Sequence, residues 1–388
     1  MFRVGLIILF LQASIIFSQA EEPTTSGAVG SVTIDGTMYN QLAFRPSFSF
    51  GKLGLGLDVY VYFNQETGFY WDAWKFTDAN GKFSIQNSYE TIMDKLYFIS
   101  WGSKKDNFYA RAGALPKLTL GEGILIKNYS NVVFYPDIRK LGFDISVELF
   151  DKVGLEFVHS DMKNFTSAEI LGSRFYIKPI DKLQVGFSYV TDLNQYSGLP
   201  DSDDDTYPDF YDHLPNDATQ YDSVIAKSDY YKEVFNTIPD IDGYTFEDFL
   251  NGFPGGNTYD PSKPDTSRLD AWSVDLSYNL NSNISIYSQY ASLVGNTDTL
   301  FTSSNIAQDT KLGWGATPIG FGMHFGPIDL NIEYRMSSER FLFNFWDQAY
   351  SIDRVLVENE MLKTKTQSLS KFGPLQGLYG RLGGNISN

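Results

Sequence analysis

Residues 328–335 read IDLNIEYR, in which apolar and polar side chains alternate without exception. Because successive side chains of a β-strand point to opposite faces, this pattern predicts a strand with one apolar and one polar face. The same alternation recurs in the stretches 53–64, 143–149, 183–189 and 274–280. We therefore predict that most of the chain is all-β, with strands that each present two different faces.

The connections between these stretches fall into two classes of length. The short ones contain Asp, Asn, Gly or Pro and favour hairpin turns. They are residues 150–153, 179–182, 281–283 and 326–327. Others, such as 64–93 and 295–310, are much longer. Tight turns that alternate with long loops are typical of an antiparallel transmembrane β-barrel, which has short periplasmic turns and long outside loops.

A soluble, secreted sandwich or solenoid is the alternative, since its strands would also alternate. Two features favour the barrel. The alternating stretches often reach ten residues or more, whereas strands of globular proteins average about five or six. Aromatic residues also cluster near the ends of the predicted strands, as at 69–74 and at Tyr97 and Trp101. Such clusters suit an aromatic girdle at a membrane interface.

The first twenty residues are predicted to be a signal peptide. Arg3 supplies a positive charge, residues 4–17 are largely apolar, and 18–20 read SQA before a plausible cleavage site. The apolar stretch is shorter than the roughly 18 residues that a transmembrane helix needs. We therefore expect an exported protein located in the cell outer membrane, in contact with outer-membrane lipid.

Composition excludes several other classes. The chain of 388 residues has no cysteine, which excludes disulfides, thiolate metal sites and a lipoprotein anchor. Its formal net charge of -17 argues against a nucleic-acid partner, because phosphate binding needs a basic surface.

Most of that negative charge lies in one insert. Residues 195–267 hold 16 Asp or Glu and 3 Lys, a net charge of -13. This stretch is too long for a plain loop, and short helices are expected at 229–236 and after Thr245. The predicted organisation is therefore a signal peptide at 1–20, a first part of the barrel at 21–194, the acidic loop at 195–267 and a second part of the barrel at 268–388.

The number of strands follows from the remaining length. Roughly 295 residues lie outside the signal peptide and the insert, which corresponds to about 12–14 strands at about 20–25 residues per strand and connection. Residues 375–382 resemble the start of a strand. We expect the chain to be a fragment that lacks its closing strands, or else a complete barrel with an atypical last strand.

The sharpest motif lies within the insert, where eight Asp fall between positions 201 and 222 with no Lys or Arg. Residues 201–215, DSDDDTYPDFYDHLP, resemble a thrombospondin type-3 calcium repeat. The resemblance implies a Ca²⁺ site, since calcium takes about 6–8 oxygen ligands. Its ligands would be the side chains of Asp201, Asp203, Asp205, Asp209 and Asp212 and the backbone carbonyl of Tyr207. Thr206 stands where the repeat usually has Gly, which would weaken the site. The alternative is a solvated acidic loop.

Charged residues on the polar faces are the candidates for lining a lumen. They are Asp58, Arg111, Glu148, Glu156, Arg174, Asp275, Glu333 and Arg335. Two interpretations stay open: a surface that selects a small solute, or Arg–carboxylate pairs that fill a narrow barrel.

The chain as a whole is similar to porin-like outer-membrane barrels, and the resemblance is loose and fold-wide. It implies a channel for an unidentified small solute. The alternative is a structural or adhesive barrel whose calcium-ordered loop binds a partner. Residues 118–131 are expected to form a Gly-rich strand followed by a polar turn. No enzyme is expected, because His159, Ser160 and Asp161 are adjacent on one strand and point to opposite faces.

Overall fold

The computed structural model describes residues 26–34, 36–70, 76–77, 81–85, 87–88, 91, 95–134, 138–165, 168–203, 205, 207–209, 212, 214–219, 236, 245–246, 267–295, 297, 311–358 and 361–384. The predicted signal peptide and nearly all of the two predicted loop helices lie outside these residues. Contacts divide the chain into two compact units, Met1–Leu115 with Phe134–Val158 and Pro116–Val133 with His159–Asn388. None of the described helices is long and apolar enough to cross a bilayer.

The first unit contains two antiparallel runs of strands. One is a four-stranded sheet in the order β1 (Ser26–Ile34), β2 (Thr37–Arg45), β5 (Val59–Asn64) and β6 (Gly68–Phe69). The other runs through β3 (Ser47–Phe50), β4 (Leu53–Leu57), β7 (Leu96–Trp101), β8 (Phe108–Gly113), β9 (Gly142–Leu149) and β10 (Val153–His159).

The alternating stretch 53–64 is not one strand, contrary to expectation. β4 pairs with β3 and β7, whereas β5 pairs with β2 in the other sheet. The break falls at Asp58, which is fully buried and forms an ion pair with Arg45 at 3.3 Å. Pro46, between β2 and β3, lies next to this break. Proline has no N–H to donate to a neighbouring strand, so regular pairing is interrupted there as well. The change of sheet is therefore made where a buried charge and a proline replace regular pairing.

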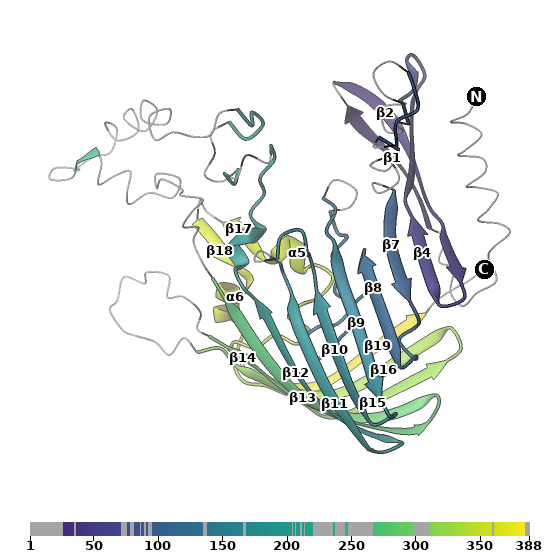
Figure 1. Cartoon of the computed structure of the whole chain (residues 1–388). Helices are drawn as coiled ribbons and strands as arrows, with labels where there is room; N and C mark the ends of the chain where they lie inside the picture. The colour runs from purple at the N-terminus through teal and green to yellow at the C-terminus, as the bar shows by residue number, and fades with distance from the viewer. Residues whose placement is uncertain are drawn as a thin grey trace. The chain divides into compact units, whose positions relative to one another are not determined.

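The second unit is built on seven antiparallel strands. Their order is β19 (Leu375–Gly384), β16 (Ile328–Ser337), β15 (Trp314–Phe325), β14 (Ile284–Val294), β13 (Leu269–Asn281), β12 (Leu183–Asp192) and β11 (Leu171–Ile180). These strands form a curved sheet (Figure 1). With the six strands of the corresponding run in the first unit, this sheet has 13 strands. The described residues form 19 strands in three sheets, more than the predicted 12–14 for the chain. The all-β, antiparallel class is confirmed.

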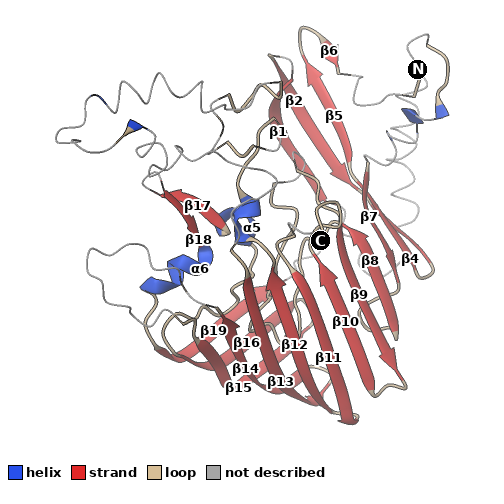
Figure 2. Ribbon diagram, turned by 60° about the vertical axis from the view of Figure 1, so that its left-hand side comes forward, coloured by secondary structure: helices blue, strands red, loops and turns tan. Residues whose placement is uncertain are grey.

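Short elements accompany this sheet. They are η2 (Gln195–Gly198), α5 (Tyr350–Asp353), the hairpin of β17 (Val355–Glu358) with β18 (Met361–Thr364), α6 (Lys365–Ser368) and η3 (Leu369–Lys371). Figure 2 shows α5, α6 and the hairpin near one end of the strands.

The four predicted tight turns are confirmed. Strand ends flank residues 150–152, 181–182, 282–283 and 326–327. Phe150 and Asp151 have φ of 56° and 54°, and the Lys152 N–H donates to the Leu149 carbonyl at 3.0 Å, as in a type I′ turn whose two central residues are left-handed. The longest connection in the second unit separates the end of β12 at Asp192 from the start of β13 at Leu269, and it contains the acidic insert.

The sheet of the second unit exposes apolar side chains and buries charged ones. On β13, Val274 and Leu276 are 40% and 45% exposed, whereas the intervening Asp275 is 5% exposed. On β16, Ile332 is exposed and Glu333 is buried. Alternation along a strand places these side chains on opposite faces. One face of this sheet is therefore polar and covered, and the other is apolar and open.

Two segments cover the polar face. The loop Pro116–Val133 reaches it through Ile124, whose backbone N–H donates to the Gln289 side chain at 3.0 Å. The segment 338–374, which carries α5 and α6, reaches it through Arg354 and Asp192. The two segments also contact each other, since Trp346 N–H donates to the Leu125 carbonyl at 3.1 Å.

Candidate functional site

The polar face carries closely matched ion pairs. Arg174 on β11 and Asp275 on β13 are both buried and lie 2.7 Å apart. A methyl group on Gly186, between them on β12, would lie 2.4 Å from the Arg174 guanidinium. The pair therefore depends on the absence of a side chain on the strand that separates its members.

A second cluster gathers around Glu333 on β16. Its carboxylate lies 2.5 Å from Arg335 and 3.5 Å from the Lys127 ammonium, and it accepts a hydrogen bond from the Tyr287 hydroxyl at 2.8 Å. Arg335 also stacks over the Tyr379 ring, 3.5 Å from its centroid. The cluster thus joins β14, β16, β19 and the loop Pro116–Val133.

The remaining predicted lumen residues belong to the first unit. Asp58 is buried and pairs with Arg45. Arg111 donates to a backbone carbonyl at 2.8 Å and lies 3.7 Å from the centroid of the Phe98 ring. Glu148 on β9 and Glu156 on β10 are half-buried. Four of the eight predicted residues are thus brought together in two pairs on the second unit.

Residues 118–131 do not form the expected Gly-rich strand. They form an irregular loop closed by an isolated bridge between Leu118 and Tyr129. Gly121 has a φ of +59°, and a methyl group there would lie 3.0 Å from Arg174 Nε. The glycine is therefore needed for a left-handed turn and for close approach to a buried ion pair. The local sequence pattern predicted a strand, because such a pattern carries no information about the surface on which the segment packs.

The segment 338–374 is held by a buried network that sequence reasoning missed. Arg354, 2% exposed, donates from Nε to Asp192 at 2.7 Å and from a second nitrogen to Asp192 at 2.8 Å. Tyr350 also donates to Asp192, at 2.7 Å. Burial lowers the pKa of Arg354, but Asp192, Tyr350 and Glu169 together raise it, so the net shift is upward. Asp192 continues the series of polar positions along its strand, and this could have identified it as a candidate residue. Arg354 lies in a segment without periodic alternation, so the pattern could not have identified it.

A further hydrogen-bonded group ties both covering segments together. The Glu169 carboxylate accepts from the Tyr129 hydroxyl at 2.5 Å and from the Ser351 hydroxyl at 2.7 Å. All three side chains are buried. Burial and the adjacent carboxylate raise the pKa of Tyr129 well above its ordinary value, so this phenol stays a hydrogen-bond donor.

His159, Ser160 and Asp161 take structural roles. The His159 ring stacks on Phe165 with centroids 4.7 Å apart, and its Nδ1 accepts from the Asp161 backbone N–H at 3.2 Å. The Asp161 carboxylate accepts from the turn that follows it. The three side chains do not form a relay.

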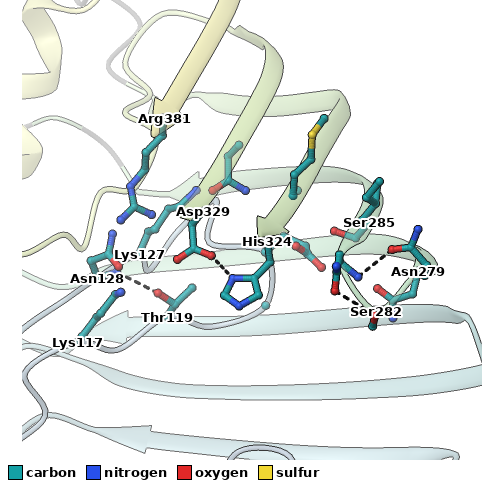
Figure 3. A pocket seen from close by; sticks show the side chains of 18 residues that line it. Lys117, Thr119, Lys127, Asn128, Asn279, Ser282, Ser285, His324, Asp329 and Arg381 are labelled. Carbon is teal, nitrogen blue, oxygen red and sulfur yellow. Dashed lines mark hydrogen bonds and ion pairs between the residues drawn. The ribbon is translucent and has the colours of Figure 1, made fainter. Parts of the chain in front are cut away.

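A cavity of about 380 Å³ opens on the polar face where the tight turns β13–β14 and β15–β16 meet the loop Pro116–Val133. Figure 3 shows Lys117, Lys127 and Arg381 on one side of it and the pair His324–Asp329 beside them. Most of the residues that line it are polar, and Ile284 and Met323 add apolar surface. A cavity with charged, amide and hydroxyl groups can bind a small polar solute.

Two ionisable groups of the loop at this cavity have shifted pKa values. Burial, together with the nearby Asp275 carboxylate, raises the pKa of Glu122. Burial lowers the pKa of Lys127, although Glu333 acts in the opposite direction. Both shifts favour the neutral form, as desolvation does for either sign of charge.

The acidic repeat is described in part. Asp201, Asp203 and Asp205 each offer a carboxylate oxygen, and these three atoms all lie within 4.8 Å of one another. Asp209 accepts from the backbone and hydroxyl of Ser202 at 2.8 and 2.7 Å. The other predicted ligands are Asp212, which accepts from the Leu214 backbone at 2.8 Å, and Tyr207, whose N–H donates to Asp205 at 2.8 Å.

The apolar face ends in an aromatic belt. Trp272, Tyr290 and Trp314 come from three adjacent strands, with ring centroids 5.5 and 5.8 Å apart. The predicted girdle at 69–74 lies mostly outside the described residues. Apolar strands that face outward, polar groups inside and an interfacial aromatic girdle define a class, the outer-membrane β-barrel proteins. The second unit has the sheet of that class.

Comparisons with known proteins found matches among solved structures. No family model and no curated protein matches the chain. Among solved structures, it is similar to the NanC porin (7% identity, TM-score 0.28, covering 93% of this chain and 100% of that one). It is also similar to OmpF of Salmonella typhi in complex with daunomycin (11%, 0.31, 92% and 95%). A third match is the outer-membrane channel DcaP of Acinetobacter baumannii (10%, 0.30, 88% and 83%).

Proposed function

We propose that the protein is a porin-like channel of the outer membrane that passes a small polar solute. The observation that supports this proposal is the sheet of the second unit. Its open face is apolar, and its covered face holds paired charges and a polar cavity. A water-soluble protein would bury the apolar side chains and expose the charged ones. The loop Pro116–Val133 and the segment 338–374 lie on the polar face, where they would narrow a passage.

The test is conductance of the purified full chain in planar lipid bilayers. Insertion is checked first by the change in gel migration between boiled and unboiled samples and by resistance to carbonate extraction. We expect discrete conductance steps and swelling of liposomes in small polar solutes. A protein that inserts and yet conducts nothing over a range of salts contradicts the channel, and one found wholly in the soluble fraction contradicts the barrel as well.

We also propose that the acidic repeat binds Ca²⁺ and orders the long connection after β12. Asp203 and Asp205 each have a buried carboxylate oxygen that receives no hydrogen bond within the described part of the chain. With Asp201 they form an all-oxygen donor set, which suits a hard cation. Asp209 and Asp212 shape the loop through their backbone contacts. Binding that favours the ordered loop would stabilise it by about 2.7 kcal/mol at a hundredfold excess of calcium over the dissociation constant.

The calcium proposal is tested on the full chain by protease protection of the connection with and without calcium. The Asp203→Asn/Asp205→Asn variant should lose the protection. Asp217→Asn is the matched control, because Asp217 lies outside the group of Asp201, Asp203 and Asp205 and its side chain accepts from Thr219. Equal cleavage of wild type in the presence and absence of millimolar calcium contradicts the site. Calcium-dependent cell binding by a chain without conductance would instead favour the structural or adhesive barrel.

A further inference from the structure

The cavity on the second unit brings together cations from distant parts of the chain. Lys117 and Lys127 come from the loop Pro116–Val133, and Arg381 comes from β19. Arg381 is the register partner of Asn331 on β16, so it lies on the same polar face as Asp329 and Glu333. Figure 3 shows the three cationic side chains on one side of the cavity.

The carboxylates at this site do not balance these cations. Glu333 lies 3.5 Å from Lys127 but only 2.5 Å from Arg335, which already neutralises it. Asp329 contacts His324, which is charged only when protonated, so Asp329 counts as one negative charge at the site. Among the residues that the structure describes, no ion pair joins Lys117 or Arg381 to a carboxylate. Positive charge therefore remains in excess on this side of the cavity.

The excess charge is also partly removed from water. Burial lowers the pKa of Lys127, and repulsion by Arg335 and Arg381 acts in the same direction, against the attraction of Glu333. Glu122, the nearest carboxyl group of the loop, has a raised pKa and is biased toward its neutral form. An anion in the cavity would relieve the repulsion among the cations. Opposite charge within a few ångströms favours the charged form of each.

Much of the remaining lining supplies neutral hydrogen-bonding groups. They come from the two tight turns and the adjacent strands and are Asn279, Asn281, Ser282, Asn283, Ser285 and Asn331. Amides and hydroxyls both donate and accept hydrogen bonds. They suit the uncharged polar part of a solute whose anionic group lies against the cations.

We propose that this cavity is a binding site for small polar oxyanions, whose carboxylate or phosphate group contacts Lys117, Lys127 and Arg381. The role of the site in solute selection rests on the proposed channel function, whereas binding itself does not. Arg and Lys form charge-assisted hydrogen bonds to both kinds of oxyanion.

Binding is measured by calorimetric titration of the folded full chain in detergent, at low ionic strength, with inorganic phosphate and, separately, with acetate. We expect at least one probe to bind, and the Lys117→Gln/Arg381→Gln variant to bind it at least about tenfold more weakly. Lys163→Gln is the control, because Lys163 is exposed and lies outside the cavity. No heat with either probe, or equal affinity in wild type and the double variant, overturns the site. The gel-migration shift verifies that each variant is folded.

Selection is measured by the reversal potential across a bilayer with a potassium chloride gradient. The wild type should prefer anions, and the double variant should shift the potential toward cation preference while Lys163→Gln does not. Conductance with an unchanged reversal potential overturns the proposed selection. Absence of conductance would contradict the channel instead, and the calorimetric result would still decide the binding site.

Discussion

Replacing Arg354 by Met should release the segment 338–374 from the sheet. The side chain of Arg354 makes three hydrogen bonds shorter than 3.0 Å, two to the Asp192 carboxylate and one to the Asn194 carbonyl. Methionine fills a similar volume but donates nothing. Asp192, which is fully buried, would then keep a negative charge with only neutral donors, among them Tyr350.

The expected magnitude follows from that burial. Removal of one partner from a buried ion pair costs about 3–5 kcal/mol, because it leaves an uncompensated charge. If the segment detaches locally, its open population rises by more than about a hundredfold, since each 1.4 kcal/mol is a factor of ten. The double variant Arg354→Met/Asp192→Asn should be destabilised less than Arg354→Met, because it leaves no buried negative charge without a partner.

The assay is the rate of limited proteolysis within 338–374 under native conditions, with conductance recorded on the same samples. Arg340→Met is the matched control, since Arg340 pairs with the exposed Glu339 at 3.2 Å, and such pairs contribute about 0–1 kcal/mol. We expect fast cleavage and larger current fluctuations for Arg354→Met only. Cleavage no faster than in the control, or a double variant that is worse than the single one, refutes the reasoning.

Three further outcomes test other parts of the structure. Gly121→Ala should lower the free energy of unfolding, measured by urea titration, by at least about 1–2 kcal/mol. The reason is that Gly121 has a φ of +59° and that a methyl group there would lie 3.0 Å from Arg174. In the control Gly373→Ala the methyl group meets open space, and the free energy of unfolding should shift by less than about 0.5 kcal/mol. Since burial lowers the pKa of Lys127, anion preference should fall at a pH below the ordinary lysine value of 10.5, and Lys127→Arg should retain it to higher pH; identical pH profiles would contradict the role of Lys127. Leu378→Arg, on the apolar face where Leu378 is 82% exposed, should destabilise the membrane-inserted form by up to about 2–4 kcal/mol, and an unchanged unfolding midpoint in lipid would argue that this face does not contact lipid.

Period-two alternation predicted much of the fold correctly. It identified the strands around 143–149, 183–189, 274–280 and 328–335, the four tight turns between strands and the class of the sheet. It also assigned Asp275 and Glu333 to the polar face, where the structure places them. It was wrong for 53–64, where the pattern continues through Asp58 although the chain passes from one sheet to another. Alternation reports the faces of a strand and carries no information about its pairing partner.

The candidate site was predictable only in part. Arg174 and Asp275 were expected on a polar face, but their pairing across β12 requires Gly186 between them. Residues 118–131 were expected to form a Gly-rich strand followed by a polar turn, and nothing in their local pattern shows that the loop Pro116–Val133 packs on the polar face. The sequence did not identify Lys127 or Arg381 as candidate site residues.

The sequence by itself therefore determined the all-β class, the two faces of each strand and the positions of the turns, because these depend on neighbouring residues and their backbone preferences. Only the tertiary structure decided which charges neutralise each other and which remain in excess. Lys127 and Glu333 are 206 positions apart, and Asp192 and Arg354 are 162 apart. An ion pair forms only when its two charges lie within a few ångströms of each other. Residues this far apart in the sequence come that close only because the two covering segments fold onto the sheet.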